Sequence, residues 1–327
     1  MSAGARLRAD IDLERWKEAT MADHFMGVDL GSTTAKTVII DEAGEIVASE
    51  VVQMGAVSRA GLERSLTTAL QSASLAESDI AQTIGTGYGR RLVPGAGRTF
   101  TEITCHARGV AAMCPGARLV IDIGGQDSKT ILVDDWGIAE NFAMNDRCAS
   151  GTGRFFEVLA RAIECDIAEL ADLALSGEKD LEVSSMCATF AETELISLLA
   201  AGERREDIAA SVHRAVSART LGLVALVGKR SPVVMTGGVA RNAAAVHFLE
   251  EALQTTVAVP ESPQITGAYG AALLARERGR DASASGVEGA EPAGDLTEET
   301  SRSCSTCSAP DPVGDTGDHP VIPLRPV

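Results

Sequence analysis

The sequence predicts a two-lobed α/β protein in which both lobes begin with the same β-hairpin. Three observations support this: an internal repeat early in the chain, a later glycine turn between an apolar strand and an Ala-rich helical segment, and a core composition dominated by aliphatic residues. Of the 327 residues, 45% are hydrophobic but only 3% aromatic. A chain of this length and composition can bury the core of one large or two medium domains.

The internal repeat aligns residues 27–44 with residues 120–137. Each copy reads as a strand, a polar turn, a second strand and an Asp-x-x-Gly turn, which predicts a β-hairpin opening a lobe. Duplication of a whole α/β lobe is the simplest cause. The positions that coincide are Asp29 with Asp122, Gly31 with Gly124, Lys36 with Lys129, Thr37 with Thr130, Asp41 with Asp134, and Gly44 with Gly137.

The turn inside each repeat has the residue types of a phosphate-binding loop. A glycine lets the backbone approach a ligand closely, and neighbouring N–H groups and short polar side chains donate to phosphate oxygens. One such turn alone is ordinary hairpin chemistry, but two facing copies would clamp one nucleotide. The predicted phosphate-binding residues are Gly31, Ser32, Thr33, Thr34 and Lys36 in the first copy, and Gly124, Gly125, Gln126 and Asp127 in the second.

Two acids end the first strand of each repeat and are the expected catalytic carboxylates. Asp29 and Asp122 could hold Mg²⁺ through water, because Mg²⁺ prefers a few carboxylates and retains several waters. Gln126, in the second turn, is placed to orient an attacking water for phosphoryl transfer. Asp29, Asp122 and Gln126 are therefore the predicted catalytic residues.

A third glycine turn follows the apolar residues 233–236. Gly237 and Gly238 would let adenosine lie against the backbone, and Asn242 would add a polar contact near the next helix. An ordinary β-turn-α joint is the alternative interpretation. The sequence contains neither a Gly-x-x-x-x-Gly-Lys-Ser/Thr nor a Gly-x-Gly-x-x-Gly motif, so P-loop and Rossmann sites are not supported.

These motifs together resemble the acetate/sugar kinase, heat-shock chaperone and actin ATPase superfamily, whose two lobes have ribonuclease-H-like cores. Within it, the chain resembles the ATP-dependent activators of 2-hydroxyacyl-CoA dehydratases and the related ATPase subunits of benzoyl-CoA reductase. The resemblance implies an actin-like ATPase fold with a nucleotide cleft between the lobes. The motifs that carry it lie at residues 27–36, 86–90, 121–127, 144–155, 185–194 and 235–242.

The resemblance also assigns two cysteines as ligands of a [4Fe–4S] cluster. Cys148 and Cys187 each precede a segment with amphipathic helical spacing, and a helix N-terminus favours a thiolate. A cluster takes four Cys ligands, so two per chain imply one cluster shared by a symmetric homodimer. Without the resemblance, both would be interpreted as packing residues.

The other five cysteines receive a structural interpretation. Cys105, Cys114 and Cys165 are expected to be small buried side chains. Cys304 and Cys307 have metal-binding spacing but supply at most half a zinc site, and we interpret them as accessory or incidental. The histidines form no metal-ligand spacing, and His213 is expected to be partly exposed.

By resemblance, MgATP hydrolysis would change the angle between the lobes, alter the cluster and drive one electron to a 2-hydroxyacyl-CoA dehydratase. The electron would come from a low-potential donor such as ferredoxin or flavodoxin. An ATPase subunit of a benzoyl-CoA-type reductase is an open alternative. A small-molecule kinase and a chaperone-like or actin-like regulator are alternatives of another class.

Composition sets the remaining expectations. The net charge of −17 disfavours nucleic acid and membrane surfaces as partners. The odd number of cysteines favours reduced thiols or metal ligands over a disulfide framework. The lack of a bilayer-spanning apolar run and of a secretory signal predicts a cytoplasmic protein. The expected organisation is an N-terminal extension at 1–23, a first lobe at 24–117, a second lobe at 118–280 and a disordered acidic tail at 281–327. A last helix at 266–278 is the segment that could return to the first lobe.

Overall fold

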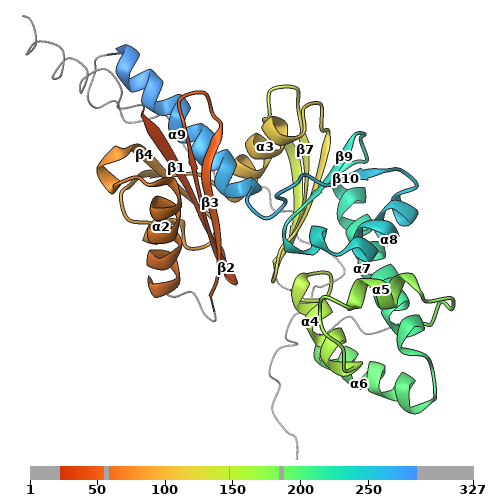
Figure 1. Cartoon of the computed structure of the whole chain (residues 1–327). Helices are drawn as coiled ribbons and strands as arrows, with labels where there is room; N and C mark the ends of the chain where they lie inside the picture. The colour runs from red at the N-terminus through yellow and green to blue at the C-terminus, as the bar shows by residue number, and fades with distance from the viewer. Residues whose placement is uncertain (1–22, 55–58, 147, 184–187, 286–327) are drawn as a thin grey trace, which may run out of the picture.

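The computed structural model describes residues 23–54, 59–146, 148–183 and 188–285. Within them the chain forms two five-stranded sheets, with strand orders β3-β2-β1-β4-β5 and β10-β9-β6-β7-β8 (Figure 1). Read in the opposite direction, the second order is β8-β7-β6-β9-β10, and it corresponds strand for strand to the first. This correspondence confirms the predicted two-lobed α/β fold. Nearly all of the predicted N-terminal extension, and of the predicted tail all but residues 281–285, lie outside the described residues.

The first lobe opens with the predicted antiparallel hairpin. In it β1 pairs with β2 and β2 with β3, whereas β4 and β5 add parallel strands beside β1. The carboxylate of Asp41 accepts hydrogen bonds from the N–H groups of Gly44 and Glu45, which closes the turn between β2 and β3. Its elements are β1 (His24–Leu30), β2 (Thr34–Ile40), β3 (Ile46–Gln53), α2 (Arg59–Ala73), β4 (Ile80–Thr86) and β5 (Ala96–Thr99).

The second lobe repeats this hairpin and then adds helices. Asp134 closes its second turn as Asp41 does, by accepting from the N–H groups of Trp136 and Ile138. The strands are β6 (Leu119–Ile123), β7 (Ser128–Val133), β8 (Ala139–Asn145), β9 (Val233–Thr236) and β10 (Val257–Ala258). The helices are α4 (Gly153–Ala162), α5 (Leu170–Leu175), α6 (Ala188–Ala200), α7 (Arg205–Val227) and α8 (Ala243–Leu253).

Side-chain alternation along β1 and β6 decides where the two strand-end acids point. Met26, Val28 and Leu30 of β1 pack in one apolar cluster with residues of α2, so Asp29, one position out of phase, faces the opposite side of the sheet. In β6, Leu119, Ile121 and Ile123 pack among the second-lobe helices, and Asp122 is again out of phase. Both acids therefore face the helices between the lobes.

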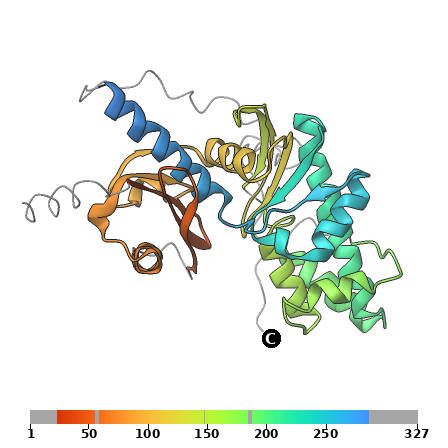
Figure 2. The ribbon, with the colours of Figure 1, turned by 45° about the horizontal axis from the view of Figure 1, so that its top comes forward.

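Those interlobe helices are α3 (Glu102–Met113) and α9 (Thr266–Ser285), which lie side by side (Figure 2). Glycines allow the close approach: a Cβ on Gly270 would lie 1.8 Å from the Cys105 carbonyl oxygen, and one on Gly109 would lie 2.1 Å from that of Thr266. The last helix packs its alanines on the first sheet, while Ala107 and Val110 of α3 pack against the second. Within the described residues, no helix is long and apolar enough to span a membrane.

Candidate functional site

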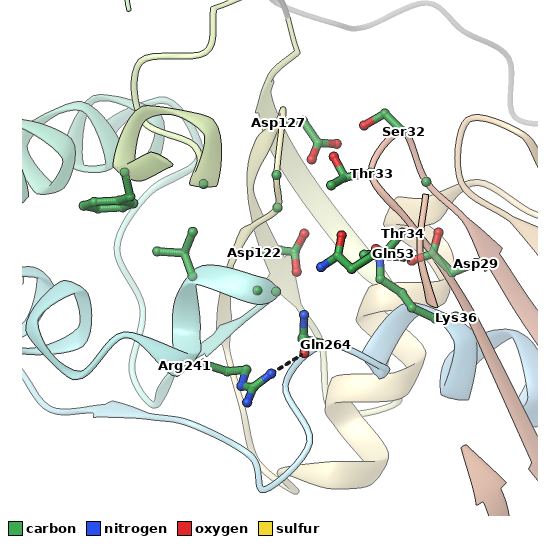
Figure 3. A pocket seen from close by; sticks show the side chains of 18 of the residues that line it. Asp29, Ser32, Thr33, Thr34, Lys36, Gln53, Asp122, Asp127, Arg241 and Gln264 are labelled. Carbon is green, nitrogen blue, oxygen red and sulfur yellow. Dashed lines mark hydrogen bonds and ion pairs between the residues drawn. The ribbon is translucent and has the colours of Figure 1, made fainter. Parts of the chain in front are cut away.

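A cavity of about 620 Å³ lies between the lobes and is lined by all three predicted glycine turns (Figure 3). Gln126, the predicted water-orienting residue, is exposed and is not among the residues that line the cavity. The predicted residues that do line it are Asp29, Gly31, Ser32, Thr33, Thr34, Lys36, Asp122, Gly124, Gly125, Asp127, Gly237, Gly238 and Asn242.

Each hairpin places an acid opposite a lysine on its partner strand. Asp29 of β1 is in register with Lys36 of β2, and Asp122 of β6 with Lys129 of β7. The Lys36 ammonium lies 2.8 Å from Asp29, and the Lys129 ammonium lies 3.2 Å from Asp122. The repeat in the sequence thus becomes two matching acid–lysine pairs on the two sides of one cavity.

The two lysines differ in their surroundings. The side chain of Lys36 is 18% exposed, and Asp29 is its carboxylate partner within ion-pair distance among the described residues. The side chain of Lys129 is only 3% exposed and lies within 3.4 Å of Glu102, Asp122 and Asp127. Burial alone would lower the pKa of Lys129, but these three carboxylates hold it well above its usual value. Lys36 is therefore the more accessible of the two lysines in the cavity, and Lys129 is an internal counter-charge.

The acids remain ionised for the same reason. Burial would raise the pKa of Asp29, but the nearby Lys36 ammonium, together with His106 and Lys129, outweighs burial and lowers it. The pKa of Asp122 is also lowered against the effect of burial, by His106, Lys129 and a hydrogen bond from the Thr236 hydroxyl at 2.8 Å. Two negative charges are thus available to a cation in the cavity.

Two residues of α3 also line the cavity, and neither of them was predicted from the sequence. Thr101 caps the helix through a hydrogen bond from the Thr104 N–H. Glu102 and His106 lie four residues apart in this helix and so one turn apart on the same face. Burial raises the pKa of Glu102 to about 7. His106 Nδ1 lies 3.5 Å from Asp122 and, among the described residues, has no hydrogen-bond partner. Neither residue belongs to a motif, so only the path of α3 between the lobes reveals them.

The two phosphate turns approach each other across the cleft. A Cβ on Gly125 would lie 2.6 Å from the Thr33 hydroxyl oxygen, and one on Gly124 would lie 2.5 Å from an Asp127 carboxylate oxygen. A side chain at Gly125 would therefore occupy the space between the turns, whereas one at Gly124 would collide with Asp127 of its own turn. The lobes can therefore place backbone groups of both turns around one ligand.

The third turn contains a glycine that packs closely against β6. Gly237 has φ of +86°, and a Cβ there would lie 2.3 Å from the Ile123 carbonyl oxygen, so this position requires glycine. Gln264 lies over Gly238 and accepts a 3.2 Å hydrogen bond from Arg241, as Figure 3 shows. The amide of Gln264 and the guanidinium of Arg241 therefore lie beside this turn in the cavity wall.

Asn242, predicted as a polar contact for the ligand, lines the cavity and also caps a helix. Its side-chain oxygen accepts from the Ala245 N–H and caps α8, and its amide nitrogen lies 3.1 Å from His213 Nε2. His213 Nδ1 lies 2.7 Å from the Ala209 carbonyl oxygen, so Nδ1 carries the proton and Nε2 accepts from Asn242. Contrary to the expectation of partial exposure, His213 is fully buried, and burial lowers its pKa to about 4. Asn242 therefore orders the turn as well as lining it.

The donor set at the cavity fits a hydrated magnesium ion. The described residues contain no cluster of three or more His, Cys, Asp and Glu side chains placed as a metal cage. Asp29 and Asp122 instead supply one carboxylate each from opposite lobes, and each is already engaged by a lysine. Such a pair suits an ion that keeps its waters and brings phosphate oxygens with it.

Cys148 lies in the loop between β8 and α4, and this loop is tied to the second phosphate turn. The N–H groups of Gly153 and Arg154, at the start of α4, donate to the carbonyl oxygens of Gly124 and Gly125 at 2.8 and 2.9 Å. The Asn145 side chain accepts from the Cys148 N–H and donates to its carbonyl oxygen. The phosphate turn and the cysteine loop are therefore joined by backbone hydrogen bonds.

The remaining cysteines follow the structural interpretation where they are described. Cys105 is fully buried, and burial raises the pKa of its thiol to about 12. Cys114 and Cys165 are half-buried and pack against apolar clusters. Cys187, the second predicted cluster ligand, and the Cys304–Cys307 pair lie outside the described residues.

Comparisons with known proteins agree with this geometry. The sequence model of the BadF/BadG/BcrA/BcrD ATPase family matches residues 26–275. An activator of lactoyl-CoA dehydratase from Anaerotignum propionicum is 46% identical over 252 residues, which are 77% of this chain and 97% of that protein. A benzoyl-CoA reductase subunit from Thauera aromatica is 33% identical over 258 residues, covering 76% of this chain and 91% of that protein.

A solved structure extends the likeness to the fold. The activator of 2-hydroxyisocaproyl-CoA dehydratase from Clostridium difficile, determined with bound ADPNP, superposes with a TM-score of 0.76 at 41% identity. The match covers 82% of this chain and all of that one. The prediction of an actin-like ATPase fold with two ribonuclease-H-like lobes is confirmed.

Proposed function

Since the chain belongs to the BadF/BadG/BcrA/BcrD ATPase family, we propose that ATP hydrolysis in its interlobe cavity drives electron transfer to a 2-hydroxyacyl-CoA dehydratase. The observation that carries the proposal is the pair of acid–lysine hairpins facing each other across one cavity with three glycine turns. This arrangement supports binding of a single MgATP by both lobes. Closure of the lobes on the nucleotide would then be coupled to its hydrolysis.

The residues of the cavity have separate roles in binding the phosphates, the magnesium ion and the adenosine of MgATP. The two phosphate turns bind the phosphates through backbone N–H groups and the hydroxyls of Ser32 and Thr33, and Lys36 neutralises phosphate charge. Asp29 and Asp122 hold the waters of the magnesium ion that accompanies ATP. The turn at Gly237 and Gly238 receives adenosine. Gln126 would have to turn toward the cavity to orient water, so its catalytic role depends on lobe closure.

We assign the electron-accepting partner from sequence identity to known proteins. Identity to the lactoyl-CoA dehydratase activator is 46%, against 33% to the benzoyl-CoA reductase subunit. These values favour a dehydratase over a reductase as the electron acceptor. A small-molecule kinase is the less favoured alternative, because the family and its similar members are ATPases and activators.

We further propose that Cys148 and Cys187 hold a [4Fe–4S] cluster shared with a second copy of the chain. Cys148 fits this role, since it lies half-buried just before α4 in a loop that the Asn145 side chain holds through two hydrogen bonds to the Cys148 backbone. When bound, the cluster supplies one-electron chemistry at low potential. A ferredoxin or flavodoxin would reduce it, and the acyl-CoA enzyme would receive the electron.

The hydrogen bonds from Gly153 and Arg154 to the second phosphate turn offer a route for coupling. Movement of that turn during hydrolysis would move the start of α4 and the adjoining Cys148 loop. The potential of a cluster depends on the hydrogen bonds and solvent around its sulfurs, so such a displacement would change the ease of electron release.

Iron and sulfide analysis of anaerobically purified protein tests this function. We expect wild-type protein to contain one cluster per two chains, and Cys148→Ala and Cys187→Ala to lose it. Cys165→Ala, which removes a half-buried thiol elsewhere in the same lobe, is the matched control and should keep the cluster. Full cluster content in both ligand variants would refute the assignment.

A further inference from the structure

A buried hydroxyl group lies beside the sulfur atom of Cys148. Ser150 Oγ is 2.8 Å from Cys148 Sγ, and Ser150 is only 1% exposed. One residue, Ala149, separates them in the sequence, and the loop folds back so that the two groups meet. Because Ser150 is shielded from water, its hydroxyl has few alternative partners.

The Ser150 hydroxyl also contacts the guanidinium group of Arg219. Arg219, from the middle of α7, donates a hydrogen bond through Nη1 to Ser150 Oγ, and the same nitrogen lies 3.5 Å from the Ser150 carbonyl oxygen. Gly151, whose φ of +111° favours glycine, lies beside this side chain: a Cβ there would be in ordinary contact with Arg219 Cδ at 3.8 Å.

The direction of these hydrogen bonds follows from the donor chemistry. A guanidinium group has only donors, so the Ser150 oxygen must accept from Arg219. The hydroxyl proton of Ser150 is then left to point at the Cys148 sulfur. A hydrogen bond whose donor is polarised by a neighbouring cation is stronger than one between neutral groups.

We propose that Arg219 and Ser150 form a donor relay to Cys148 that raises the reduction potential of the cluster held there, an inference that rests on the proposed function. A donor to a ligand sulfur stabilises the reduced cluster, which carries one more negative charge, over the oxidised one. Ser150 and Arg219 are positioning residues in this scheme, because they act on the cluster through the cysteine.

Anaerobic potentiometric titration of the cluster tests the relay. Ser150→Ala removes the donor, and Arg219→Gln removes the charge that polarises it. We expect both variants to keep wild-type iron and sulfide and to titrate at a lower potential, with the larger shift in Ser150→Ala. Ser150→Thr retains the hydroxyl and should return the potential toward that of wild type.

Two matched controls use the same lobe. Ser176→Ala removes an exposed hydroxyl that donates to the Asp172 carbonyl oxygen. Arg214→Gln removes a guanidinium on α7 that donates to the Lys179 carbonyl oxygen. Neither group contacts the Cys148 loop in the described hydrogen bonds, so both controls should titrate as wild type does.

The possible results distinguish failure of the relay from failure of the proposed function. Loaded Ser150→Ala and Arg219→Gln proteins that titrate at the wild-type potential would overturn the relay and leave the proposed function standing. Wild-type protein that binds no iron would overturn both. If Ser150→Ala fails to load, Arg219→Gln decides, because it leaves the hydroxyl in place.

Discussion

Two lysines at corresponding positions of a duplicated hairpin have acquired different roles. Lys36 pairs with Asp29 at the cavity surface, whereas Lys129 is buried among three carboxylates. An isolated buried charge is costly, so Lys129 makes possible the concentration of acids that the second lobe presents to the cleft. The repeat preserves the acid–lysine geometry, and the surroundings of each copy decide what the lysine does.

This difference predicts separate effects of removing each lysine. Lys129→Met should lower the free energy of unfolding by about 3 to 5 kcal/mol, because it leaves several buried carboxylates without their cation. Lys36→Met should cost less stability and chiefly weaken MgATP binding. Urea unfolding and nucleotide titration of both variants measure the two quantities, and equal losses of stability would contradict the division of roles.

His213 gives the fold a pH dependence with a known sign. Burial lowers its pKa from 6.5 to about 4, so the unfolded chain binds its proton more readily than the folded chain. The contribution to stability is therefore complete above pH 6.5 and is lost as the pH falls toward 4. A shift of this size corresponds to about 3 kcal/mol.

His213→Gln can still accept from Asn242 but does not titrate. Its free energy of unfolding should fall less than that of wild type between pH 7 and pH 4, and chemical unfolding across that range measures the difference. Parallel curves for the two proteins would show that His213 does not hold the low pKa.

At the scale of elements, the contact between α3 and α9 connects the lobes. Gly109 and Gly270 bring the two backbones together, and α3 carries Glu102 and His106 into the cavity. A change of angle between the lobes must be absorbed at or near this contact, since α9 packs on the first sheet and α3 also reaches the second.

Gly270→Ala should be strongly destabilising, because its Cβ would lie 1.8 Å from the Cys105 carbonyl oxygen and the helices would have to separate. Gly222→Ala, on α7, is the matched control: a Cβ there meets nothing within 4 Å. Replacing that helical glycine should stabilise the protein by about 0.5 to 1 kcal/mol. Thermal unfolding of both variants tests this, and a Gly270→Ala protein as stable as wild type would contradict the close contact.

On the scale of the whole molecule, much of the architecture follows from local patterns. The repeat predicts both hairpins because Asp41 and Asp134 close their turns with their own side chains, and alternation along β1 and β6 fixes the direction of Asp29 and Asp122. The repeat also identifies Lys129 as the counterpart of Lys36. These features are encoded within short stretches of chain.

The rest of the site depends on contacts between distant segments. His106 and Glu102 enter the cavity only because α3 crosses between the sheets, and Asn242 is held by His213 from a different helix. No local pattern distinguishes such residues from ordinary helical positions. Gln126 shows the opposite case, since a motif position suggested a catalytic role that its exposed side chain does not support in this conformation.

We propose that ATP hydrolysis in the cleft drives an electron to an acyl-CoA dehydratase. The direct test follows the redox state of the dehydratase and phosphate release together, in an anaerobic mixture of the prereduced protein and a 2-hydroxyacyl-CoA dehydratase. We predict that the dehydratase is reduced when MgATP is added and stays oxidised when MgADP replaces it. Equal reduction with either nucleotide, or ATP hydrolysis with no electron delivered, would contradict the account.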